Sequence, residues 1–243
     1  MSAGLPALLA VLGALAGPSL HGWAVAAGGR LPGRGAAPRC RSCGAARPWP
    51  GFACPGCGAR GRREVVFPVA AAAVLAGTGA VVGPVPTLPA FVVFAAVTLV
   101  LVVTDLDHKL IPNRVLYPGG AVAAVLLAAG AAAAGNAGAL PRALLGAAGY
   151  FAAFLLVALV ARGGFGFGDV KLAALLGLFT AYVSVPPLLV AVFFTGLLGG
   201  VPAIVLLATG RARRGDELPY GPAMILGAWA ALAVGDAFLA WYR

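Results

Sequence analysis

The sequence has few charged residues, and acidic residues are the scarcest of them. Asp and Glu number seven in 243 residues, and all charged residues together make up 10% of the chain. A soluble domain is usually about 25% charged and about 45–50% apolar, whereas this chain is 61% hydrophobic with a mean hydropathy of +0.98. The shortage of charge excludes an ordinary water-soluble domain and predicts a membrane protein, in which lipid takes the place of a large buried core.

Positive charge is the exception, because the net charge is +10. Such a value alone would fit a nucleic-acid-binding protein. However, eight Arg residues lie between the first two apolar runs, and most other basic residues lie in short gaps between later runs. This placement is typical of a membrane topology signal. We therefore expect a lipid bilayer, and no nucleic acid, as a partner.

Apolar runs predict an all-α fold, a polytopic transmembrane bundle of about eight spanning helices. A spanning helix needs about 20 residues. The runs lie near 5–27, 66–83, 88–104, 115–134, 143–161, 172–184, 186–208 and 220–241. The run at 172–184 is short, and Pro186-Pro187 marks a turn after it. The first run lacks the positive n-region of a signal peptide and is interpreted as a retained helix.

The runs divide the chain into a first transmembrane helix (1–27), a basic loop domain (28–65) and a transmembrane bundle (66–243). If the 28–65 loop is cytoplasmic, fifteen of the seventeen Lys and Arg residues fall in cytoplasmic loops, and only Arg142 and Arg243 do not. Such a bias predicts orientation by the positive-inside rule. We expect a multi-pass protein of the cytoplasmic (inner) membrane with both termini outside.

The sequence has only four cysteines, all in the 28–65 loop, and they form two C-x-x-C pairs: Cys40, Cys43, Cys54 and Cys57. This spacing is typical of a zinc ribbon or knuckle, in which four thiolates close a tetrahedral site. A closed site leaves no position for catalysis, so the sequence predicts a structural Zn²⁺. Two disulfides are the alternative, and a reducing cytoplasm disfavours them.

Two of the seven acidic residues stand at the same end of apolar segments. Asp105 ends the third run, and Asp169 follows a glycine-rich stretch before the sixth. An ionisable group at membrane depth is costly and marks a candidate functional site. Two carboxylates at close range cannot both ionise cheaply, so one keeps a proton and acts as a general acid while the other activates water. Asp107 competes with Asp105, but two positions apart on a helix they point to different faces.

A pair of carboxylates with these two roles is the chemistry of an aspartyl peptidase. Two other classes of function compete with this interpretation. Intramembrane Asp residues and Gly-rich breaks also occur in ion or solute transporters, whose sites usually lie near the midplane rather than at segment ends. A zinc-dependent membrane scaffold would explain the cysteines but would give the two Asp residues no role.

At these residues the sequence resembles the type IV prepilin leader peptidase family. The family's Gly-x-Gly-Asp-x-Lys-Leu motif is matched by the stretch from Gly166 and Gly168 through Asp169 to Lys171-Leu172. The family's first catalytic Asp is followed eight positions later by the Asp or Asn of an Ile/Leu-Pro-Asp/Asn motif. Here Asp105 is followed at the same distance by Asn113 of Ile111-Pro112-Asn113. The paired C-x-x-C motifs, Arg30-Leu31-Pro32 and Leu218-Pro219-Tyr220-Gly221-Pro222 are further similarities.

The resemblance implies an intramembrane aspartyl endopeptidase, which cleaves the leader of type IV prepilins or pseudopilins at the cytoplasmic membrane face. It implies Asp105 and Asp169 as the catalytic pair and no metal at the peptidase site. Gly166, Gly168, Lys171, Pro112 and Asn113 would support this pair, with Lys171 acting on Asp169 or on a nearby backbone carbonyl.

Many members of the family also methylate the new N-terminus with S-adenosylmethionine. This chain departs from their pattern, because Ala71 stands where a Glu is expected and the first segment carries Gly17-Pro18-Ser19-Leu20-His21 instead of a Gly-Ser-Phe-Leu-Asn-like element. The sequence therefore leaves N-methylation open, with S-adenosylmethionine as the cofactor if that activity is retained.

Overall fold

The computed structural model describes residues 4–29, 40, 42–45, 53–59, 61–160, 166–211 and 219–242. Within these residues all regular secondary structure is helical, which confirms the predicted fold class. The family-like residues Arg30, Leu31, Pro32 and Leu218 lie outside the described part of the chain.

The described helices correspond to the eight apolar runs. They are α1 (Gly4–Gly29), α2 (Arg62–Val82), α3 (Leu88–His108), α4 (Asn113–Ala133), α5 (Ala139–Val160), α6 (Phe167–Val183), α7 (Val185–Thr195), the π-helix η1 (Gly196–Gly200), α8 (Val201–Ala208) and α9 (Gly221–Tyr242). Because α7, η1 and α8 follow one another without a break, they form one segment. Within the described residues, six stretches are long and apolar enough to cross a membrane: α1 to α5, and Val185–Leu206.

Helix α6 begins earlier than the apolar run predicted. It starts at Phe167 rather than near 172, after Gly166 with an extended backbone, so Asp169 lies in its first turn. The predicted run near 172–184 had left Gly168 and Asp169 outside the helix. With 17 residues α6 is about 25 Å long, which is shorter than the hydrocarbon core. It ends at Val183. The next residue, Ser184, has an extended backbone that separates α6 from α7, whose first turn contains Pro186.

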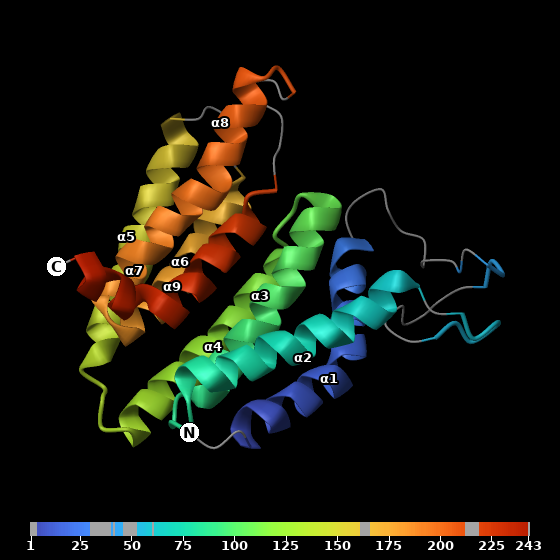
Figure 1. Cartoon of the computed structure of the whole chain (residues 1–243), viewed down its shortest axis with the longest axis horizontal. Coiled ribbons are helices and arrows are strands. Elements are labelled where there is room, and N and C mark those ends of the chain that lie inside the picture. The colour runs from blue at the N-terminus through green and yellow to red at the C-terminus, as the bar shows by residue number, and fades with distance from the viewer. Residues whose placement is uncertain are drawn as a thin grey trace.

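The segments run up and down in one bundle (Figure 1). The end of α3 and the starts of α4, α6 and α9 gather at one end of it, near the upper centre of the view. The largest helix contacts are between α5 and α6, α1 and α2, α7 and α9, and α3 and α4. This arrangement brings three segments that are distant in sequence to the same end of the molecule.

Aromatic side chains fill the centre of the bundle. Phe94 of α3 stacks on Phe179 of α6 with ring centroids 4.2 Å apart, and Phe91 meets the same ring edge-on at 5.1 Å. Trp229 of α9 lies 5.3 Å from Phe94 and donates its indole N–H to the Thr98 hydroxyl at 3.2 Å. The indole N–H thus has the polar partner that it needs away from water, and α3, α6 and α9 are held together below the site.

The outer face of the bundle is apolar as well. Leu15, Leu145 and Val160 expose 72%, 73% and 76% of their side chains on three different helices. Large apolar surfaces of this kind are unfavourable in water but suit contact with lipid. Together with the six helices of spanning length, they identify a multi-pass membrane protein.

Candidate functional site

Asp105 lies in the last turn of α3 and points into the protein. Its side chain is 4% exposed, and its carboxylate accepts a hydrogen bond from the Gly221 amide at 3.0 Å. Helix α3 ends at His108, and Lys109 follows it with left-handed backbone geometry (φ 52°) and donates its N–H to the Asp105 carbonyl at 2.7 Å. The helix end therefore fixes both the backbone and the side chain of Asp105.

Asp169 occupies the third position of α6. Its side chain is 7% exposed, and its N–H donates to the Gly166 carbonyl at 3.0 Å. The Gly166 amide in turn donates to the Asp169 carboxylate. Because the first amides of a helix lack partners within the helix, this reciprocal contact caps α6 and holds the carboxylate at the helix start, where negative charge is favourable.

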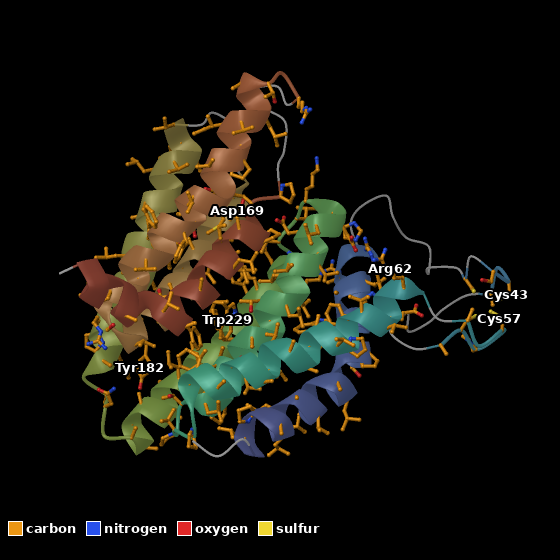
Figure 2. The ribbon with its side chains drawn as sticks, in the orientation of Figure 1. Cys43, Cys57, Arg62, Asp169, Tyr182 and Trp229 are labelled. Atoms are coloured by element: carbon orange, nitrogen blue, oxygen red, sulfur yellow. The ribbon has the colours of Figure 1, made fainter. Side chains whose placement is uncertain are left out.

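The fold brings Asp105 and Asp169 together at one end of the bundle. Their carboxylates lie within electrostatic range of each other. Figure 2 shows Asp169 where α3 approaches α6 and α9. Ile111, which is 7% exposed, fills the space between the two helix starts: a Cβ at Gly168 would lie 3.0 Å from the Cβ of Ile111, and a Cβ at Gly221 would lie 3.4 Å from its Cδ1. The glycines of the family-like motif thus let α6 and α9 approach Ile111.

Asp107 has a different partner. It forms an ion pair with Arg63, from the start of α2, and keeps 20% of its side chain exposed. Asp105 points to another face of the same helix turn and is buried against Gly221. The two carboxylates of this turn therefore face different neighbours.

Lys171, Asn113 and Pro112 connect α6 with α4. Pro112 precedes α4, and the Lys171 ammonium donates to the side-chain oxygen of Asn113, the first residue of α4, at 3.1 Å. The ammonium also lies over the rings of Phe167 (4.9 Å) and Tyr117 (5.4 Å). The described contacts of Lys171 are thus with this amide and these rings. They differ from the expected contact with Asp169 or a backbone carbonyl, because the side chain leaves α6 toward α4.

Tyr220 and Gly221 belong to the site although the sequence analysis gave them no role in it. The Gly221 amide contacts Asp105 directly, and the phenol of Tyr220 lies within electrostatic range of Asp169. The available signal was the Pro219-Tyr220-Gly221-Pro222 stretch before the last apolar run. Its sequence indicates a helix start but not which carboxylate this start faces.

The four cysteines lie together in the loop between α1 and α2. Figure 2 shows Cys43 and Cys57 at its right-hand edge, apart from Asp169. Their sulfur atoms all lie within 4.8 Å of one another, with Cys40–Cys57 at 3.7 Å and Cys43–Cys54 at 3.6 Å. Sulfur atoms around a tetrahedral zinc ion are separated by about 3.8 Å, since each Zn–S bond is about 2.3 Å. The donor set therefore fits a tetrahedral metal ion.

The two cysteine turns have the same backbone design. The Cys40 N–H donates to the Ala45 carbonyl at 2.9 Å and the Cys54 N–H to the Ala59 carbonyl at 3.0 Å, and each turn closes with a left-handed glycine, Gly44 or Gly58. Hydrogen bonds from the Cys43 and Ser42 amides lower the pKa of the Cys40 thiol to about 6. The Gly56 amide likewise lowers the pKa of Cys54. One thiol of each turn, Cys40 or Cys54, therefore favours the thiolate form that binds metal. The neighbouring cysteines instead raise the pKa of Cys43 to about 12 while no metal is bound.

The region around Ala71 does not fit a site for S-adenosylmethionine. Ala71 is fully buried, and a Cβ at Gly13 of α1 would lie 2.5 Å from the Ala71 carbonyl oxygen. Here α1 and α2 pack backbone against backbone, without the carboxylate that the resemblance leads one to expect.

Comparisons with known proteins agree with the geometry. Residues 92–204 match the type IV leader peptidase family. Among curated proteins, the prepilin leader peptidase/N-methyltransferase of Bacillus subtilis is 34% identical over 154 residues, which cover 62% of this chain and 58% of the relative. The protein of the same name from Pseudomonas aeruginosa is 32% identical over 57% of this chain and 47% of its own length. The chain thus spans about half the length of the curated relatives that it matches.

No solved structure matches this chain. The match to the family begins in α3 and ends in α8, so it contains both buried carboxylates and the helices that carry them. Over residues 92–204 the chain is therefore similar to the type IV leader peptidase family.

Proposed function

We propose that this protein is an intramembrane aspartyl endopeptidase that removes the leader peptide of type IV prepilins or pseudopilins, with Asp105 and Asp169 as the catalytic pair. One observation carries the proposal: two carboxylates from separate helices are buried within electrostatic range of each other at the same end of a membrane bundle. The similar proteins named prepilin leader peptidase support the class of substrate.

The chemistry follows from the pairing of the two carboxylates. One proton is shared by the pair, because two neighbouring carboxylates cannot both ionise cheaply. The ionised carboxylate takes a proton from a water molecule, and the resulting nucleophile attacks the scissile carbonyl. The protonated carboxyl gives its proton to the carbonyl oxygen, and the tetrahedral intermediate collapses as a proton passes to the leaving amide nitrogen.

The position of the pair suits a substrate that is partly in the membrane. The end of the bundle that holds the carboxylates also carries Lys109, Arg114 and Lys171. By the positive-inside rule this is the cytoplasmic end. The basic leader of the substrate would remain in the cytoplasm while its apolar helix lies in the bilayer beside the bundle. The cleaved bond would then lie at the membrane surface, level with Asp105 and Asp169.

We also propose that the four cysteines hold one structural Zn²⁺. Four thiol donors at tetrahedral spacing leave no coordination position for substrate. The ion would hold together a small loop that has little core of its own.

The proposal is tested by co-expression of a type IV prepilin with the wild-type protein and with Asp105→Asn, Asp169→Asn and Asp107→Asn. Cleavage is followed by gel shift and by the mass of the mature N-terminus. We expect wild type and Asp107→Asn to cleave and the other two variants to be inactive. Asp107→Asn is a matched control, because it makes the same change on the same helix turn but at the Arg63 ion pair.

Equal cleavage by all four proteins would assign the activity to a host enzyme or to other residues and would refute the proposed pair. No cleavage of several prepilins from the source organism by any of them would favour the transporter alternative, and ion flux in proteoliposomes would then be measured. The mass of a cleaved product also shows whether a methyl group has been added. An unmethylated product would agree with the packing around Ala71.

A further inference from the structure

The start of α9 supplies the hydrogen bond that holds Asp105. The Tyr220 carbonyl accepts the N–H of Met224 at 3.2 Å, so Tyr220 stands at the cap position and Gly221 is the first helical residue. The amide of a first helical residue has no acceptor within its own helix. Here it donates to Asp105 Oδ2 at 3.0 Å, in a buried position. Asp105 is thereby bound to the amide end of a helix on which it does not itself lie.

Gly221 can approach Asp105 this closely only because it has no side chain. A Cβ at this position would lie 2.9 Å from Asp105 Oδ2 and 3.3 Å from its Cγ. A small displacement of the start of α9 would therefore either break the hydrogen bond or push the carboxylate away from Asp169. The placement of Asp105 depends on what fixes this helix start.

Tyr220 fixes it by resting on the π-helix η1. A Cβ at Gly199 would lie 2.5 Å from Cζ of the Tyr220 ring, so the ring occupies the space that a side chain on η1 would need. The Tyr220 hydroxyl donates to the Thr195 carbonyl at 3.1 Å, directly before η1. Single π-helical turns inside α-helices are rare, and those that occur are often found at functional sites. Here it forms the seat for the aromatic ring next to the site.

Thr195, which accepts the hydrogen bond from Tyr220, is itself held in place by α5 and α9. It is 1% exposed, and its side chain shares a hydrogen bond of 2.7 Å with the Tyr150 hydroxyl of α5. Two turns into α9, a Cβ at Gly227 would lie 2.9 Å from the Thr195 amide nitrogen. Thr195 is thus contacted by Tyr220, directly before α9, and by Gly227, two turns into the helix.

We infer that Tyr220 is a positioning residue: seated on Gly199, it sets the start of α9 so that the Gly221 amide holds Asp105 facing Asp169. The inference rests on the proposed function, since it assigns Tyr220 a role in the reaction of that pair. It predicts that changes on η1, away from both carboxylates, alter the catalytic step rather than substrate binding.

The test uses two neighbouring glycines of η1. Gly199→Ala places a methyl group against the Tyr220 ring, whereas the Cβ of Gly200→Ala would lie 3.8 Å from the Tyr220 hydroxyl, an ordinary contact. Purified proteins in detergent are compared for kcat, KM and melting temperature with a prepilin substrate. We expect Gly199→Ala to lower kcat by about 10- to 100-fold with KM little changed, because misplacement of a catalytic group by about 1 Å has effects of this size. Gly200→Ala should keep kcat and KM near wild type.

Three further variants separate positioning from general stability. Arg142→Met removes the donor to the carbonyls of Ala181 and Tyr182 at the opposite end of α6 from Asp169, so it should lower the melting temperature but not kcat. Tyr220→Phe keeps the ring and should retain most of the activity, whereas Tyr220→Ala should lose as much as Gly199→Ala. Adding Gly199→Ala to Tyr220→Ala should cause no further loss, since the two changes act on one contact.

The outcomes distinguish this inference from the proposed function. If Asp105→Asn and Asp169→Asn abolish cleavage while Gly199→Ala and Tyr220→Ala keep the wild-type kcat, the positioning role is refuted and the catalytic pair stands. The same conclusion follows if these two variants change KM alone. If Asp105→Asn still cleaves, the proposed pair itself is wrong and the positioning role falls with it. Should Gly199→Ala fail to fold, Tyr220→Ala decides, because it removes atoms rather than adding them.

Discussion

Arg142 is one of the two basic residues that the predicted topology leaves outside the cytoplasmic loops, and its contacts explain its position. From α5 it donates to the carbonyls of Ala181 and Tyr182 at 2.7 Å and of Val183 at 3.2 Å. The last carbonyls of a helix lack partners within the helix, and α6 is too short to carry this end fully into the headgroup region. An internal guanidinium therefore replaces water as the donor.

At this residue we predict that Arg142→Met destabilises the protein. Methionine keeps much of the apolar stem but leaves the carbonyls at the end of α6 without donors, which costs about 1–3 kcal/mol. The change is read as a lower melting temperature in detergent. Arg142→Lys is the control and should have an intermediate effect, because one ammonium cannot reproduce the guanidinium fork. A melting temperature of Arg142→Met equal to wild type would contradict this account.

At the scale of elements, α5 and α6 pack through glycines that face each other. A Cβ at Gly177 would lie 2.5 Å from the Gly146 carbonyl oxygen, and a Cβ at Gly146 would lie 2.9 Å from that of Gly177 and collide with Ala181. Small residues allow membrane helices to approach closely. This contact fixes the position of α6, and hence of Asp169, against the rest of the bundle.

For this element pair we predict opposite results at two glycines of α5 that are three residues apart. Gly146→Ala forces the helices apart and should destabilise the protein by about 1–3 kcal/mol. Gly149→Ala meets no atom within 4 Å and should be neutral or slightly stabilising. Unfolding in mixed detergent micelles measures both variants. Similar stability of the two would show that the close α5–α6 contact is absent in the membrane.

At the scale of the whole molecule, the cysteine loop and the helix bundle are separate stabilising systems. The cysteine turns hold their sulfur atoms together through local backbone hydrogen bonds, whereas the bundle is held by aromatic and glycine contacts between helices. The ion pair between Arg63 and Asp107 connects α2, which follows the loop, to the end of α3. It is exposed on the Arg63 side, and such pairs contribute little stability.

We therefore predict that metal removal loosens the loop and leaves the bundle folded. A strong chelator should release one zinc ion per chain and make the 40–57 region sensitive to protease, with little change in helical content. Cys43→Ser should have the same effect without chelator. Backbone hydrogen bonds lower the pKa of the Cys40 thiol and so favour its thiolate, and protons should displace zinc from the thiolates as the pH is lowered. Loss of helical content together with zinc would contradict the separation of the two systems.

Much of the fold was predictable from the sequence because the bilayer imposes strong rules on composition. The eight apolar runs match the eight helical segments, and the cysteine spacing predicted a cluster whose sulfur atoms do lie together. Local glycine geometry was harder to predict. The apolar run began near 172, yet α6 begins at Phe167, with Gly166 as its cap and Gly168 in its first turn, where the missing side chain leaves room for Ile111.

The sequence by itself predicted a chain that spans a membrane as helices and cysteines that can bind a metal. It also predicted Asp105 and Asp169 as the candidate catalytic pair. These conclusions follow from composition, spacing and motif, which depend on neighbours along the chain. Only the tertiary structure decided that Asp105 is held by the amide of Gly221 while Asp107 pairs with Arg63, and that Lys171 turns to Asn113. Each of these contacts joins helices distant in sequence, and their geometry depends on how closely the packed helices approach each other.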